Sequence, residues 1–193
     1  MLTLIVGLAL FFSLHSVSII APHWRDQMLL HVGTGAWKSL YALLSGIGLV
    51  LIVVGFAHAR PSAAVLYMPP ASLRLVSLLL MLPVFPLLLA AYLPGRIRTR
   101  AKHPMLAAVK LWATAHLLAV GTLPDVLLFG CFLIWAIVDR ISLKPRRPAP
   151  PPSAPLSRHG DLIAVVLGLA LYALFLLKLH ALLIGVAPLA PPI

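Results

Sequence analysis

Six long apolar segments divide this chain, and they constrain its fold more than any other feature of the sequence. At roughly 1.5 Å per residue each segment can cross about 30 Å of hydrocarbon as a helix, with the fourth and fifth near the lower limit. Hydrophobic residues make up 62% of the chain and charged residues 10%. This composition predicts an all-α, polytopic membrane helix bundle with about six transmembrane helices. The segments run over residues 2–21, 37–57, 72–93, 104–120, 124–138 and 161–187.

The distribution of basic residues predicts how these segments cross the membrane. The chain has 15 lysines and arginines and a formal net charge of +11. Most of them lie in the first, third and fifth connections, as in the run RIRTRAK from Arg96 to Lys102, whereas Arg60 and Arg74 lie on the opposite side. Because basic loops stay in the cytoplasm, we expect a multi-pass protein of the bacterial inner membrane with both termini on the periplasmic side. The positive charge then reports topology rather than nucleic-acid binding.

The sequence divides into three regions at a proline-rich stretch. Residues 1–143 are expected to form a five-helix membrane bundle, and residues 144–160 a cytoplasmic linker made largely of proline, alanine and serine. Residues 161–193 would then form the sixth transmembrane helix and a tail. The linker predicts a loose tether between this last helix and the others.

Two shorter signals predict local breaks. Pro83 and Pro86 each remove a backbone hydrogen bond from the third segment, which predicts a kink. In the run GTLPD, Gly121 can end the fourth helix while Thr122 and Pro124 can begin the fifth. The fourth and fifth helices are therefore expected to form a tight hairpin.

The scarcity of acidic residues and cysteine excludes several kinds of chemistry. The chain has no glutamate and only four aspartates, so a carboxylate-rich di-metal site or a paired-carboxylate hydrolase is nearly excluded. Cys131 is the only cysteine, which removes an intrachain disulfide, a CxxC redox pair and the covalent attachment of a c-type haem. Any haem in this protein must be held without thioether bonds.

Two histidines fall near the middle of the bilayer on this topology, and they are the leading candidates for chemistry. His15 lies in the first apolar segment and His116 deep in the fourth. An ionisable side chain inside a membrane span is a functional-site hypothesis by default. Neutral imidazole is a common ligand of haem iron, and two such groups on facing helices can clamp a porphyrin. The alternative is that each histidine bonds a carbonyl, a serine or water inside the bundle.

The sequence gives weaker evidence of a functional role for the other polar residues in and near the fourth segment. His103 precedes the helix-starting proline in the basic loop, where an interfacial role is favoured over iron ligation. Lys110 shares a helical face with His103, and its alternatives are snorkelling to the interface or binding an anion such as a haem propionate. Trp112 shares its face with His116 instead. No chemistry is assigned to the histidines expected in loops or near outer helix ends, namely His23, His31, His58, His159 and His180.

The stretch RTRAKHPMLAAVKLWATAHLLAVGTLPDVLLFG, from Arg98 to Gly130, resembles the NnrU family. That family's pattern has a basic residue before His-Pro-Met, then Trp, Ala-His-Leu-Leu and a glycine before Leu-Phe-Gly. The first-segment histidine and the run GAWKSLYALLSGIGLVLIV from Gly35 also fit. The resemblance extends to about Arg140. Bacterial members are associated with nitrite and nitric oxide reduction, and the family is similar to zeta-carotene isomerase, a membrane protein that uses a b-type haem.

The resemblance implies a role for particular residues. His15 and His116 would be the axial ligands of a non-covalent haem b, with His103 near the site but off the iron. The isomerase has a cysteine three positions before the second histidine that is implicated in ligand switching, and Ala113 stands in that place here. Lys102 replaces the usual arginine before His-Pro and keeps its charge. Val120 replaces a frequent asparagine and removes a hydrogen-bonding group.

Three functions follow as hypotheses. The leading one is a haem b protein that supports nitrite or nitric oxide metabolism as a sensor, haem handler or electron-transfer protein, with a membrane redox partner. The second is an enzyme, a haem-dependent cis-trans isomerase of a hydrophobic polyene that enters from the lipid bilayer; the loss of the cysteine at Ala113 weakens it. The third is a cofactor-free transporter or assembly factor whose histidines relay protons.

Overall fold

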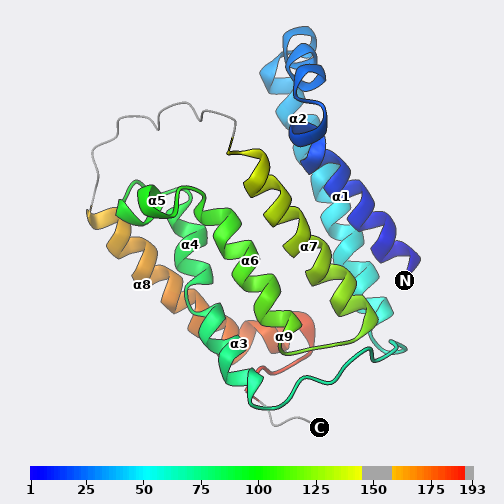
Figure 1. The fold of residues 1–193 in the computed structure, drawn as a ribbon, viewed down its shortest axis with the longest axis vertical. Helices are drawn as coiled ribbons and strands as arrows, with labels where there is room; N and C mark the ends of the chain where they lie inside the picture. The colour runs from blue at the N-terminus through cyan, green and yellow to red at the C-terminus, as the bar shows by residue number, and fades with distance from the viewer. Residues whose placement is uncertain (145–157, 190–193) are drawn as a thin grey trace. The chain divides into compact units, whose positions relative to one another are not determined.

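The computed structural model describes residues 1–144 and 158–189, and within them the regular structure is helical apart from an isolated β-bridge between Val65 and Thr122. The all-α prediction is thus confirmed for this part of the chain (Figure 1). Most of the predicted linker falls on residues 145–157, outside the described residues. The elements are α1 Leu2–Ile20, α2 Pro22–Ala59, α3 Leu73–Met81, α4 Val84–Ala90, α5 Arg96–Ala101, α6 Pro104–Leu117, α7 Leu123–Ser142, α8 Arg158–Leu174, the π-helix η1 Phe175–Leu179 and α9 His180–Ile184.

Among the described residues, four helical stretches are long and apolar enough to cross a membrane. They are Leu2–Ile20, Pro22–Ala59, Leu73–Ala90 and His159–Ile184. The expected fourth span, α6, has only 14 residues, fewer than the roughly 20 that a spanning helix needs. The expected fifth, α7, has 20 residues, with Asp125 near its start and Arg140 near its end. The count of six spans therefore stays a prediction.

The chain divides into two compact units. The N-terminal unit contains Met1–Val65 and Thr122–Cys131, and the C-terminal unit contains Leu66–Gly121 and Phe132–Ile193. Helix α7 is continuous and contributes its first residues to the one and its remainder to the other. His15 and His116 thus belong to different units.

Small residues bring α1 and α2 into close antiparallel contact within the N-terminal unit (Figure 1). A Cβ added at Gly7 would lie 2.7 Å from the Ile52 nitrogen, and one at Gly55 would lie 2.6 Å from the Leu4 Cα. Helices in lipid associate through such small residues because their backbones can then approach closely. The pairing of Gly7 with Ile52 and of Leu4 with Gly55 sets the register of the two helices.

Helix α2 extends further toward the N-terminus than the sequence predicts. Residues 22–36 were expected as a connection, but α2 begins at Pro22, and its regular geometry is interrupted at Gly33, where φ is +81° and ψ is 157°. Proline at the first helical position already has a helical φ and no N–H to satisfy, so it starts this segment. His23 and His31 therefore lie on a helix rather than in a loop, and His159 likewise lies in α8.

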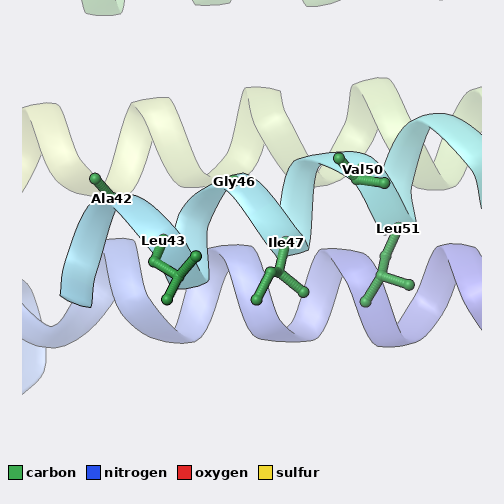
Figure 2. A pocket seen from close by; sticks show the side chains of 6 residues that line it. All are labelled: Ala42, Leu43, Gly46, Ile47, Val50 and Leu51. Carbon is green, nitrogen blue, oxygen red and sulfur yellow. The ribbon is translucent and has the colours of Figure 1, made fainter. Parts of the chain in front are cut away.

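Between residues 42 and 51, one face of α2 is lined by apolar residues only. Figure 2 shows a shallow depression lined by Ala42, Leu43, Gly46, Ile47, Val50 and Leu51. Of these, Leu43 and Val50 are more than half exposed. Such a stripe on a long apolar helix is consistent with contact to lipid tails.

The C-terminal unit forms around the predicted kink. Helix α3 ends at Met81 and α4 begins at Val84, so the break falls at Leu82 and Pro83 and confirms the kink predicted at Pro83, whereas Pro86 lies within the first turn of α4. Both α3 and α4 pack against α6, and α8 packs against α4 (Figure 1). The contact between α8 and α4 is close, because a Cβ added at Gly168 would lie 2.7 Å from the Pro86 Cα.

The Asp161 carboxylate connects the start of α8 to the start of α5. The two Asp161 carboxylate oxygens accept hydrogen bonds from the backbone N–H groups of Arg96 and Ile97, at 2.8 and 3.0 Å. These are the first residues of α5, whose N–H groups have no partner within their own helix. The sixth apolar segment is thus held to the C-terminal unit by hydrogen bonds as well as by packing.

Candidate functional site

His15 lies on α1 among aromatic rings of the N-terminal unit. Its Nδ1 is 2.8 Å from the carbonyl oxygen of Phe11, one turn earlier, and the imidazole stacks on the Phe11 ring with centroids 3.9 Å apart. The Tyr41 ring of α2 lies 5.2 Å from it. The side chain is half-buried, and its orientation is set by a backbone bond and two rings.

His116 occupies a similar environment on α6 in the C-terminal unit. Its Nδ1 is 2.8 Å from the carbonyl oxygen of Trp112, again one turn earlier. The centroids of the Trp112 and His116 rings are 5.3 Å apart, and Phe132 packs edge-on against Trp112 at 5.4 Å. The predicted pairing of Trp112 with His116 on one face is therefore confirmed.

These hydrogen bonds decide which nitrogen of each imidazole can bind a metal. A carbonyl oxygen can only accept, so Nδ1 donates in both histidines, and in the neutral ring Nε2 carries the lone pair. Metal-bound histidines commonly donate their second N–H in this way. His31 has the same bond to Gln27 at 2.8 Å but is exposed, so partial burial among rings distinguishes His15 and His116 from it.

The structure places the two predicted ligands in separate units, and their pairing stays a prediction. Among the residues that the structure describes, no group of three or more histidine, cysteine, aspartate or glutamate side chains is arranged to hold a metal ion. A cage of protein ligands alone is thus missing from residues 1–144 and 158–189. A centre that takes few protein ligands, such as haem iron, fits this donor set better.

His103 and Lys110 lie apart from the aromatic cluster. His103 precedes Pro104 at the start of α6, as the sequence predicts, but the basic run before it forms the short helix α5 rather than an irregular loop. Lys110, two turns further along, is half-buried. Burial lowers the pKa of His103 from its usual 6.5, the Arg140 guanidinium lowers it further, and the Asp139 carboxylate opposes this shift. His103 is therefore neutral over a wider pH range than an ordinary histidine.

We expect the imidazole of His103 to titrate below pH 6.5 in the folded protein, because burial and Arg140 both disfavour its charged form. Between its folded pKa and 6.5 the unfolded chain binds more protons, so this contribution to stability is complete above 6.5 and is lost as the pH falls through that window. Arg140→Gln should raise the midpoint without restoring 6.5, since burial is the larger cause. NMR titration of the His103 ring measures this, with Arg100→Gln as the charge-matched control. A midpoint at or above 6.5 in the unsubstituted protein would contradict the prediction.

The sequence assigns no chemistry to His180, yet the structure brings it close to His116. The two ring centroids are 6.4 Å apart and their planes differ by 22°. His180 begins α9, directly after the π-helix, and its Nδ1 is 2.7 Å from the Val186 carbonyl oxygen. The sequence offers little that could predict the proximity of His180 to His116. A histidine near an outer helix end is ordinarily solvated, and hydropathy does not predict a π-helix.

Across residues 1–144 and 158–189 the regular structure is helical apart from one β-bridge, and four helical stretches are long and apolar enough to cross a membrane. Half-buried imidazoles lie on these and neighbouring helices. The NnrU protein family matches residues 3–188, nearly the whole chain. The chain belongs to this family. No curated protein and no solved structure matches it.

Proposed function

We propose that this protein is an integral membrane b-type haem protein in which His15 and His116 are the axial ligands. The observation that carries the proposal is that the two imidazoles have the same environment and the same hydrogen bond. Each is half-buried against aromatic rings, and each donates Nδ1–H to the carbonyl one turn earlier at 2.8 Å. In this tautomer Nε2 is the ligand atom, which suits haem iron.

The surrounding residues supply what a bound haem would require. Phe11 and Tyr41 at His15, and Trp112 with Phe132 at His116, offer apolar ring surfaces that exclude water. Lys110 lies roughly 9 Å before His116 along α6, on the face that it shares with His103, and we propose that it could reach an acidic side group of the haem only at the edge of the site. The backbone bonds at Nδ1 hold both imidazoles in orientation, and they raise the basicity of Nε2.

Bound iron would supply reversible one-electron chemistry, and gas binding when an axial position opens. Two histidine ligands favour electron transfer or sensing in nitrite and nitric oxide metabolism over substrate chemistry. Ala113 is fully buried and has no thiol, which disfavours the polyene isomerase as the function. In this proposal the chain makes six passes through the bacterial inner membrane, with both termini periplasmic and a membrane redox partner.

The test is to purify the protein in mild detergent, with haem added, and to record oxidised and dithionite-reduced absorption spectra. We expect the sharp reduced bands of a six-coordinate b haem, because both axial positions are filled by imidazole. Haem content per chain is measured in parallel. A folded protein that stays colourless after haem is added would overturn the proposal.

A further inference from the structure

The short helix α5 carries a cluster of cations at one end of the C-terminal unit. Arg96, Arg98 and Arg100 lie on α5, and Lys102 directly follows it. Arg96, Arg100 and Lys102 are exposed, whereas Arg98 is half-buried. Arg96 and Arg100 lie one turn apart on the same face of the helix, with about 5–6 Å between their Cβ atoms. These four residues are called the α5 cation cluster below.

The α5 cation cluster lies where two candidate membrane spans end. The span Leu73–Ala90 ends shortly before α5, and the span His159–Ile184 begins beside it. Helix α5 contacts α4, α6 and α8 (Figure 1). The contact at the start of α8 is close, because a Cβ added at Gly160 would overlap the Pro94 carbonyl oxygen. Since headgroups lie where spanning helices leave the hydrocarbon, the cluster is at the depth of lipid phosphates.

The C-terminal unit has too few carboxylates to neutralise these cations. The chain has no glutamate, and the acidic residues of this unit are Asp139 and Asp161. Both Asp161 oxygens accept hydrogen bonds from backbone N–H groups at the start of α5, and the Asp139 carboxylate accepts one within α7. Within residues 1–144 and 158–189, the salt bridge that forms is Arg25 with Asp26, in the N-terminal unit. The cluster therefore takes its counter-ions from outside the chain.

Lys102 occupies a strained turn between α5 and α6. Its φ is +58° and its ψ is −47°, and the His103 N–H bonds to the Ala101 carbonyl oxygen at 2.6 Å, which closes a γ-turn. Turns of this hand are rare and strained, whereas glycine adopts a positive φ readily. A lysine here therefore lowers the free energy of unfolding relative to glycine. Strain of this kind is typical of residues that bind a ligand.

We propose that the α5 cation cluster binds the phosphate headgroup of an anionic phospholipid of the bilayer. A guanidinium group donates two parallel hydrogen bonds to a phosphate, and the Lys102 ammonium adds a compact charge. The headgroup supplies the negative charge that the unit lacks, while the acyl chains lie along the apolar spans. The N–H groups at the start of α5 take no part, because Asp161 already occupies them. This binding does not involve haem, so its test is separate from that of the proposed function.

The experiment titrates the full-length protein in detergent micelles with phosphatidylglycerol and, separately, with phosphatidylcholine of the same acyl chains. Native mass spectrometry measures the bound lipid. Each cation near the membrane surface contributes about fivefold in affinity, so Arg96→Gln/Arg100→Gln should weaken phosphatidylglycerol binding about 25-fold and leave phosphatidylcholine binding unchanged. Arg25→Gln/Lys38→Gln is the matched control, because it removes the same charge outside the cluster and Arg25 is already paired with Asp26.

Lys102→Gly separates lipid binding from folding. It should weaken phosphatidylglycerol binding about fivefold while raising the stability of the protein, because glycine relieves the strained turn. Circular dichroism of each variant shows whether the helices are intact. Equal affinities for the two lipids, or the same loss in the α5 double variant as in its control, would overturn the proposal. Inorganic phosphate that displaces phosphatidylglycerol at equal concentration would identify a site for the free anion instead of the lipid.

Discussion

His116→Ala is expected to cause the largest functional loss of any single substitution. In the proposed site His15 would bind opposite His116, so the variant would leave one face of the haem without a ligand. Removing an outer-shell partner of a metal site typically costs about 10–100-fold in affinity, and a ligand contributes more. We therefore expect haem affinity to fall by at least about 100-fold, with any residual haem five-coordinate.

The measurement is a haem titration followed by absorption in detergent, with His31→Ala as the control that removes an equivalent but exposed imidazole. Trp112→Phe adds a graded variant, because it keeps an aromatic ring beside His116 and the backbone carbonyl that orients it. It should retain most of the haem. An unchanged titration for His116→Ala would show that His116 is not a ligand.

Gly55→Ala is expected to have the largest effect on stability. Its added Cβ would lie 2.6 Å from the Leu4 Cα and 2.8 Å from the Thr3 carbonyl carbon, and neither backbone atom can move without separating α1 from α2. Overpacking of this kind costs about 1–3 kcal/mol, and a clash with backbone falls at the upper end. Gly46→Ala is the matched control, because nothing lies within 4 Å of its added Cβ.

The two substitutions should change the free energy of unfolding in opposite directions. Alanine favours a helix over glycine by about 1 kcal/mol, so Gly46→Ala should be neutral or stabilising. The free energy of unfolding is measured by titrating sodium dodecyl sulfate into detergent micelles while following tryptophan fluorescence. Two of the four tryptophans, Trp24 and Trp37, lie on α2 with ring centroids 5.9 Å apart. Equal stabilities for the two variants would contradict the close contact of α1 with α2.

The helices that the sequence predicts correctly are those whose signals are local. A run of apolar residues satisfies its own backbone as a helix wherever it lies in the membrane, so residues 2–21 and 37–57 are readable from hydropathy. The break at Pro83 follows from the missing N–H of proline. The start of α7 follows from a side-chain cap, since the Asp125 carboxylate accepts hydrogen bonds from the Thr122 backbone and hydroxyl.

The sequence predicts the wrong structure where the local signals for a helix and for a connection are about equally strong. Residues 22–36 are more polar than a span and contain Gly33, so composition favoured a connection, although Pro22 can begin a helix. Trp24 and Trp37 then pack across the interruption at Gly33 with ring centroids 5.9 Å apart, a contact between residues far apart in sequence. Such a contact stabilises the segment only after the chain has folded and brought the two rings together, so local sequence does not predict it.

For the site, the sequence by itself determined that imidazoles are the strongest ligand candidates in the apolar segments, and that haem could not be attached through cysteine. The i−4 carbonyl bonds of His15 and His116 are local helix geometry and follow almost directly from it. Only the tertiary structure decided that His180 lies 6.4 Å from His116. The reason is that this distance depends on the packing of α8 against α4 and on the single extra residue of the π-helix, neither of which has a periodic signal in the sequence.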